Sequence, residues 1–163
     1  MSVKNFINSD LKFSIDFFPA NFYVYEITGD FEKGNIEFRS EEVIDDYWGP
    51  YITFEYSWEH VPFDERDSDG DLINEIDVHF SKIGLQRIDR IQKYIQSDYL
   101  QYLIGGRIKH VKNKAYAVIE IHGIWYDEIT ERVVNFNFSV LREIFDDWKN
   151  PLIQLIESVK FHI

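Results

Sequence analysis

Apolar and polar side chains alternate along much of this chain, and no other feature of the sequence constrains the fold as strongly. In YITFEYSW, residues 51–58, every second side chain from Ile52 onward is apolar and the side chains between them are mostly polar. A period of two residues is typical of a strand with one buried face. Related patterns predict further strands at residues 11–18, 22–28, 35–39, 73–80, 107–111, 115–126 and 131–140.

A change of period after residue 80 predicts a helix over residues 84–103. There, apolar residues recur at spacings of three and four, and polar residues fill the positions between them. This spacing forms one apolar stripe on an amphipathic helix, which we expect to pack on the sheet before ending at Gly105-Gly106. The stripe consists of Leu85, Ile88, Ile91, Tyr94 and Ile95.

The C-terminal segment predicts a second helix over residues 150–159. Asn150 suits the cap position, and Pro151 suits the first helical position because its missing N–H has no partner there. The predicted strands come in hairpin-connected groups and do not alternate singly with helices. We therefore expect one α+β domain over residues 1–163, in which the long central helix and the C-terminal helix pack on an antiparallel sheet as an α-β-α sandwich.

Composition and charge argue against several classes of function. The chain is 45% hydrophobic and 17% aromatic, which is enough for a sizeable core. Its net charge of −12 repels nucleic-acid backbones and anionic membrane surfaces, so neither is an expected partner. Without cysteine, disulfides, thiolate nucleophiles and zinc–thiolate sites are excluded. The first residues, MSVKNFINSDL, lack the apolar core of a signal peptide, and we expect a cytoplasmic protein.

Three local features are shared with a known family. An amphipathic segment, Phe13–Pro19, ends in proline and is followed by the aromatic Phe22, a late hairpin begins with Ala115-Tyr116, and the last predicted helix runs into Ser158–Phe161. With the order of elements, these features resemble the PsbP-like family, which includes a photosystem extrinsic subunit and a Ran-GTPase-binding protein. The resemblance implies an α-β-α sandwich and protein binding without catalysis. Phenylalanine at position 22, where tryptophan is common, and the helix predicted at 84–103 depart from the family's pattern.

The stretch RDSDGDLINEID, residues 66–77, partly matches a calcium-binding loop. A helix–loop–helix calcium site needs oxygen ligands at loop positions 1, 3, 5 and 12 and glycine at position 6. If Gly70 is that glycine, position 12 is Ile76, and a loop starting at Asp67 places Val78 there, so neither register fits. Two interpretations stay open. One is a solvated turn between strands, and the other is a non-standard calcium site formed by Asp67, Asp69, Asp71 and Asp77.

Histidines and glutamates are further candidates for chemistry. The five histidines show no metal-binding or catalytic spacing. If His79 and His122 meet on neighbouring strands, they could bind zinc together with Glu120. Glu55, Glu59 and Glu120 are expected on polar strand faces, where a pair of carboxylates could exchange protons. The alternative for all of these residues is an ordinary place on the surface.

Aromatic residues in acidic segments are the candidate partner-binding residues. Tyr47 and Trp48 precede Gly49-Pro50, and Trp148 follows two aspartates. Exposed tryptophans in polar loops suit recognition because they bury a large area at a small entropic cost. The alternative is that they fold back over the edges of the sheet.

These observations favour a non-enzymatic interaction domain that binds a protein partner or self-associates through its acidic, aromatic loops. The absence of catalytic spacing and the family resemblance support this hypothesis. Two alternatives stay open: a small-molecule or metal-dependent enzyme with a pocket between sheet and helix, and a calcium-binding protein that uses the acidic loop. No cofactor other than calcium is expected.

Overall fold

Two sheets contain the strands of the described chain. The computed structural model describes residues 2–41, 52–60, 77–95, 98–127 and 129–160. Within these residues, a large sheet of seven strands has the order β3-β4-β5-β9-β8-β7-β6, and a small sheet of three strands has the order β1-β2-β10. The elements are β1 (Val3–Asn8), β2 (Phe13–Pro19), β3 (Phe22–Gly29), β4 (Lys33–Ser40), β5 (Ile52–His60), β6 (Gln86–Ile95), β7 (Asp98–Val111), β8 (Lys114–Asp127), β9 (Arg132–Leu141), α2 (Arg142–Glu157) and β10 (Val159–Lys160).

Every strand pair of the large sheet is antiparallel, as the hairpin-connected pattern predicts. Most neighbours in the sheet are also neighbours along the chain, and β5 pairs with β9 across a long sequence separation. The β7–β8 hairpin turns at Lys112 and Asn113, whose φ angles of 47° and 68° suit the two left-handed positions of a type I′ turn. The α+β class with a mostly antiparallel sheet is therefore confirmed.

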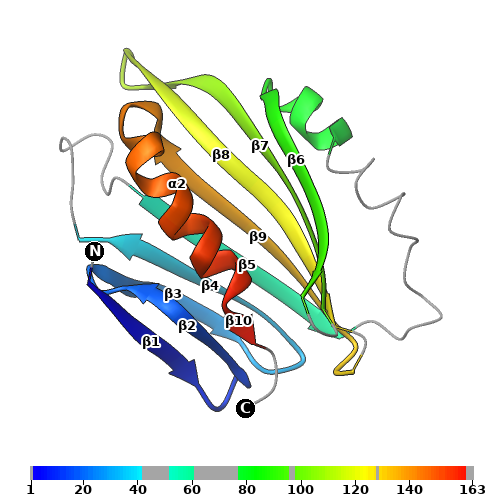
Figure 1. Cartoon of the computed structure of the whole chain (residues 1–163). Helices are drawn as coiled ribbons and strands as arrows, with labels where there is room; N and C mark the ends of the chain where they lie inside the picture. Colours follow the sequence, from blue (N-terminus) through cyan, green and yellow to red (C-terminus); the bar gives the residue numbers. More distant parts are fainter. Residues whose placement is uncertain (1, 42–51, 61–76, 96–97, 128, 161–163) are drawn as a thin grey trace.

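The small sheet and α2 cover one face of the large sheet (Figure 1). In the small sheet, β2 pairs with β10 on one side and with β1 on the other, although the sequence pattern predicts no strand at β1. The end of α2 is attached to β2, because Ser158 Oγ accepts a hydrogen bond from the backbone N–H of Phe17 at 2.9 Å. The layer that covers this face thus consists of the helix α2 and the small sheet.

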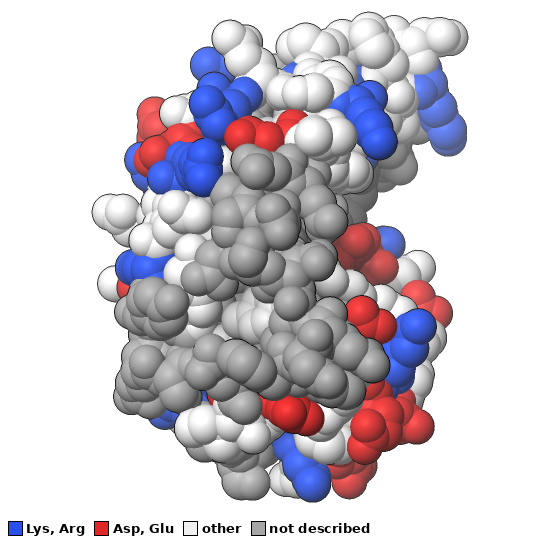
Figure 2. Space-filling view, turned by 90° about the vertical axis from the view of Figure 1, so that its right-hand side faces the viewer, with Lys and Arg blue, Asp and Glu red and all other residues white. Residues whose placement is uncertain are grey.

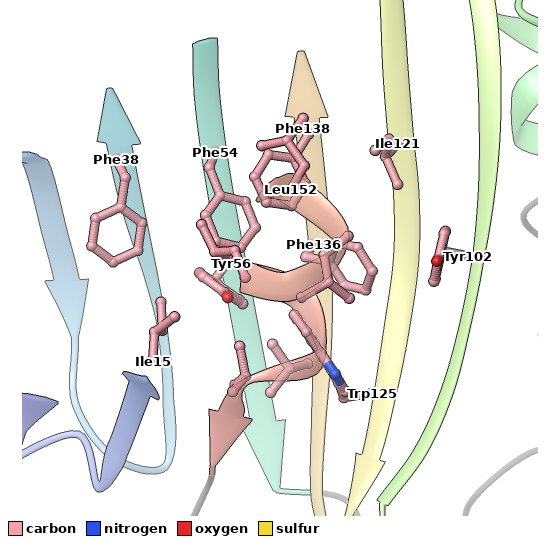
Figure 3. Close-up of a cluster of buried hydrophobic side chains, with 14 of the residues drawn as sticks. Ile15, Phe38, Phe54, Tyr56, Tyr102, Ile121, Trp125, Phe136, Phe138 and Leu152 are labelled. Atoms are coloured by element: carbon pink, nitrogen blue, oxygen red, sulfur yellow. The ribbon is translucent and has the colours of Figure 1, made fainter. Parts of the chain in front are cut away.

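Aromatic rings from neighbouring strands form the centre of the core (Figure 3). Phe38, Phe54 and Phe138 lie opposite one another in register, and each is fully buried. The rings of Phe54 and Phe138 stack with their centroids 3.7 Å apart. Leu152 of α2 belongs to the same cluster, so the helix packs directly on this aromatic row.

The C-terminal helix begins earlier than predicted, at Arg142, and Pro151 lies inside it. A proline in a helix interior costs about 3 kcal/mol. Each large apolar side chain contributes about 1.5–3 kcal/mol when it is fully buried, so a buried stripe outweighs that cost. The predicted start at Asn150 was wrong because tertiary packing overrides the local proline signal. The buried apolar stripe of α2 consists of Phe145, Leu152, Leu155 and Ile156.

The long central helix predicted over residues 84–103 was wrong, because residues 86–95 form β6 and residues 98–103 form the first part of β7. A β-bulge in β6 inserts Ile88 as an extra residue. The bulge changes the face on which the apolar side chains lie, so Leu85 packs on one face of the sheet and Ile91 on the other. The resulting spacing imitates the period of a helix. The predicted central helix is therefore not part of this fold.

The strand predicted at 73–80 is also wrong where the structure describes it, because residues 77–82 form a helix, shown in green beside β6 (Figure 1). Phe80 is 2% exposed, whereas Val78 is 53% exposed. The alternation of Val78 and Phe80 with polar residues therefore does not mark a buried strand face, because Phe80 is buried and Val78 is not. Residues 73–76 lie outside the described residues.

Candidate functional site

The face of the large sheet opposite α2 carries polar side chains on its central strands. Successive side chains of a strand point to opposite faces. The residues between the core aromatics of β4, β5 and β9 therefore point away from the core. We call this side of the sheet the open face. On these strands it presents Asn35, Glu37, Glu55, Ser57, Asn135 and Asn137, all half-buried or exposed.

Register aligns five of the polar side chains of the open face into one row. Glu26 lies opposite Glu37, and Glu37 lies opposite Glu55. Glu55 in turn lies opposite Asn137, which lies opposite His122. The Cβ atoms of directly opposite residues are about 4.5–5.5 Å apart, so neighbouring side chains can touch. We call these five residues, Glu26, Glu37, Glu55, Asn137 and His122, the polar row.

A cavity of about 580 Å³ lies over the polar row. All residues of the row line it, and His79 from the 77–82 helix forms part of its wall. Cavities of about 300–1,000 Å³ accommodate small ligands, and this one is large enough to take side chains of a peptide. On the side of the molecule shown in Figure 2, acidic side chains gather toward the lower right and basic ones toward the upper end.

A second apolar cluster holds the 77–82 helix on the open face beside the cavity. Gly105 permits the close contact, because a Cβ atom there would lie 2.7 Å from Phe80 Cε2. Asp77 of the helix also forms an ion pair with Arg87 of β6 at 2.9 Å. These contacts fix the position of His79. The cluster consists of Phe80, Leu85, Leu103, Ile124, Tyr126 and Val133.

A buried carboxylate, Glu120, lies next to the polar row and is paired with a cation. Arg107 Nη2 donates a hydrogen bond to Glu120 Oε1 at 2.9 Å, and the Glu120 side chain is 4% exposed. His122 Nε2 lies 3.7 Å from Glu120 Oε2. Burial alone would raise the pKa of Glu120, but the His122 imidazole and the Arg107 guanidinium outweigh it and hold the pKa below its ordinary value of 4.5. Glu120 is therefore ionised at neutral pH.

Glu55 has the opposite electrostatic environment. Partial burial and the neighbouring Glu37 carboxylate raise the pKa of Glu55 above its ordinary value of 4.5, although Arg39, Lys109 and His122 act in the opposite direction. Glu37 itself accepts a hydrogen bond from Arg39 Nε at 2.6 Å. Among the described residues, no ion pair includes Glu55 or Glu26. The polar row therefore carries negative charge that the described chain leaves unpaired.

Four buried polar atoms of the open face have no hydrogen-bond partner in the part of the chain that the structure describes: Asn137 Oδ1, Ser139 Oγ, Glu120 Oε2 and His122 Nε2. In register, Asn137 lies opposite His122 and Ser139 lies opposite Glu120, so the four atoms belong to one patch of the sheet. Buried polar groups in proteins are normally paired. Glu120 Oε2 and His122 Nε2 lie 3.7 Å from each other, and of the four residues Asn137 and His122 line the cavity. An occupant that supplies hydrogen bonds would therefore meet these two residues.

The structure places the carboxylates and histidines that could have formed an acid–base pair or a zinc site. Strand β9 lies between the strands of Glu55 and Glu120, so their backbones are roughly 10 Å apart, too far for direct proton exchange. His79 does meet His122, with ring centroids 5.4 Å apart, but from a helix and not from a neighbouring strand. Within the described ranges, no three His, Asp or Glu side chains are arranged to hold a metal ion.

Most of the other predicted site residues lie outside the described residues: Asp67, Asp69, Asp71, Tyr47 and Trp48. The calcium site therefore stays a prediction, and its remaining member, Asp77, pairs with Arg87. Trp148 lies in α2, and its placement in a loop was wrong. Its ring is half-buried and stacks on Phe22 with centroids 5.8 Å apart. The role of Trp148 in partner binding stays a prediction.

Glu26, Glu37, Asn135 and Asn137 are not among the predicted site residues, although all four line the cavity. The signal that could have found them is the polar character of the outward positions on several strands. A central strand covered on both faces is apolar throughout. Polar outward positions on β4, β5 and β9 therefore indicate a face of the sheet left for solvent or for a partner.

Comparisons with known proteins define the fold. No protein-family model and no curated protein matches this sequence. Among solved structures, the chain is similar to the solution structure of cyanobacterial PsbP (CyanoP) from Synechocystis sp. PCC 6803, with a TM-score of 0.66 and 11% identity over 98% of this chain and 92% of that chain. The PsbP-like fold implied by the resemblance is therefore confirmed. No helix in the described ranges is long and apolar enough to cross a membrane.

Proposed function

We propose that this protein is a non-enzymatic binding domain that docks a protein partner on the open face of the large sheet. The cavity over the polar row carries the proposal, because it combines unpaired carboxylates with buried polar atoms that lack partners. A docked partner would supply both the missing hydrogen bonds and the missing charge. The PsbP-like fold supports the proposal only as a scaffold, because the site itself comes from residues of this chain.

Charge favours a different protein over a second copy of this chain. The net charge of −12 and the carboxylates of the polar row would repel an identical face. A partner with a basic surface would be attracted to the same face and would associate faster at low salt. The partner class that fits is therefore a protein with a basic docking surface.

The sequence also predicts docking through Trp148, on the other side of the sheet. Trp148 belongs to α2, which packs on the core face, whereas Asn35 lines the cavity on the open face. Both Asn35 and Lys149, the neighbour of Trp148, are exposed. A photocrosslinking amino acid at one or the other of these positions therefore distinguishes the two docking surfaces.

The test is crosslinking inside the cells from which the protein comes. The expected result is one defined heteromeric product from a crosslinker at Asn35, suppressed by excess unlabelled protein, and no such product from Lys149. Crosslinking from Lys149 alone would move the docking surface to the helix side and overturn the proposal. A product with the mass of a homodimer from Asn35 would contradict the choice of partner.

A further inference from the structure

We infer that the cavity recognises an arginine side chain presented by the docked partner, with Glu55 and Asn137 as its principal acceptors. This inference rests on the proposed docking function and names the group that the open face binds. It follows from the charge of the row, the kind of polar atoms left unpaired, and the size and surroundings of the cavity.

The charge of the polar row favours a cation, although Arg39, Lys109 and His122 of the chain already offset part of the negative charge at Glu55. Glu26, Glu37 and Glu55 lie side by side on three adjacent strands. Carboxylates placed directly opposite one another repel, so this arrangement is unfavourable unless a positive charge lies among them. Arg39 neutralises Glu37. Among the described residues, Glu26 and Glu55 have no ion-pair partner, and the raised pKa of Glu55 is consistent with that.

The unpaired atoms favour a donor. Asn137 Oδ1 is an acceptor that is buried without a partner in the described structure, so the Asn137 amide has to turn toward the cavity to accept a hydrogen bond from an occupant. Glu55, directly opposite Asn137, is also an acceptor. An occupant that contacts both residues therefore needs two hydrogen-bond donors pointing the same way. Two nearby cations are already engaged: Arg107 donates to Glu120 and to the backbone oxygen of Ile83, and Lys109, which acts on Glu55, has an interaction within the chain.

A guanidinium meets this requirement better than an ammonium. Its N–H groups form a rigid planar fork, which can bridge two acceptors on adjacent strands at once. The lysine ammonium is a compact, strongly hydrated charge that loses more on entering a half-enclosed cavity. His122 adds a ring in the cavity wall, on which a guanidinium can stack.

The surroundings of the cavity favour a guanidinium carried on a protein segment. A volume of about 580 Å³ is far larger than one guanidinium requires, which leaves room for neighbouring side chains. Next to Glu26, the edge strand β3 exposes four large apolar side chains, and exposed apolar edges suit strand addition. The opposite edge, β6, carries charged residues, which discourage such pairing. The four exposed apolar side chains of β3 are Tyr23, Val24, Tyr25 and Ile27.

The experiment is an NMR titration of the ¹⁵N-labelled full-length protein with the capped tripeptide Gly-Arg-Gly. Matched tripeptides contain lysine, or citrulline, which keeps the shape of arginine without its charge. Saturable shifts are expected at amides around Glu37, Glu55 and Asn137, with the citrulline peptide inactive and the lysine peptide weaker. Glu55→Gln should weaken arginine binding by at least about tenfold, the loss expected for one charge-assisted hydrogen bond.

Glu59→Gln is the matched control. Glu59 lies on the same strand and the same face as Glu55 and carries the same charge, but it does not line the cavity. The control should leave the affinity unchanged within about twofold, whereas equal weakening by both variants would mean bulk charge attraction and would overturn the inference. Equal binding of lysine or citrulline would overturn it as well.

The docking proposal and this inference fail in different ways. No saturable arginine binding, with crosslinking from Asn35 retained, overturns the inference and leaves the docking proposal intact. Saturable binding at Glu55 and Asn137, with no crosslinked protein, contradicts the docking proposal and leaves guanidinium recognition standing. Preservation of the amide spectrum in each variant shows that a loss of binding is not a loss of folding.

Discussion

Replacing Gly123 by alanine tests whether the aromatic core is packed as described. Gly123 lies between Phe136 and Tyr102 in register, with one on each neighbouring strand. The rings of Phe136 and Tyr102 approach across it, with centroids 6.3 Å apart. The position therefore holds glycine because neighbouring side chains occupy the space of its missing Cβ atom.

The expected cost follows from the distances. A Cβ atom at position 123 would lie 2.2 Å from Phe136 Cζ and 2.6 Å from Tyr102 Cβ, well inside the carbon contact distance of about 3.5–4.0 Å. Phe136 has little room to retreat, because it is 3% exposed and packs on Trp125 with centroids 4.2 Å apart. Overpacking costs about 1–3 kcal/mol, and this case belongs at the upper end. For a chain of this length, about 3 kcal/mol lowers Tm by about 6–12 °C.

Urea and thermal unfolding, followed by tryptophan fluorescence and circular dichroism, measure this cost. Gly106→Ala is the control, because a Cβ atom there would be 3.4 Å from Ile119 Cδ1 and meets only ordinary contacts. The control should change the free energy of unfolding by less than about 1 kcal/mol. Equal effects of the two substitutions would refute the packing described for the aromatic row.

Three further substitutions test the electrostatics and the helix. Arg107→Gln should lower the free energy of unfolding by about 2–3 kcal/mol at pH 7, because it removes the guanidinium that pairs with the buried Glu120 and leaves the His122 imidazole as the neighbouring charge partner. The pKa of Glu120 lies below 4.5 in the folded protein, so this loss should shrink as the pH falls through that lowered pKa, which urea titrations across pH would show. Glu55→Gln should raise Tm at pH 7, because the folded-state pKa of Glu55 is raised and its ionised form is disfavoured; an unchanged Tm would contradict this. Trp148→Ala should cost about 2 kcal/mol in urea unfolding, because the half-buried ring loses its stack on Phe22; unchanged stability would mean that the ring is free for a partner.

Local alternation predicts the strands well where one face is buried and the other is not. Along β5, apolar Phe54 and Tyr56 alternate with polar Glu55 and Ser57, and the structure follows that pattern. Around β6 the same reasoning failed, because the bulge at Ile88 changes the phase of the alternation, and a bulge has no clear signal in a single sequence. The family resemblance gave the right fold in spite of the wrong helix.

The candidate site depends on register, which a single sequence does not contain. Glu26, Glu37, Glu55, Asn137 and His122 are distant along the chain, and only strand pairing brings them into one row. A shift of one residue in any pair would move a whole set of side chains to the other face. Polar outward positions were therefore predictable, and their convergence on one cavity was not.

The two histidines considered as possible zinc ligands illustrate the same point. His79 and His122 do come together, but through a helix in place of the predicted strand.

The cytoplasmic location and the calcium loop stay predictions.

The most direct test of partner docking compares two charge reversals on one strand. Glu55→Lys places a positive charge inside the cavity, and Glu59→Lys places the same charge on the same face outside the cavity lining. With the photocrosslinker at Asn35, docking on the open face predicts that Glu55→Lys abolishes the heteromeric product and that Glu59→Lys retains it. Equal yields from the two variants would contradict docking at the polar row.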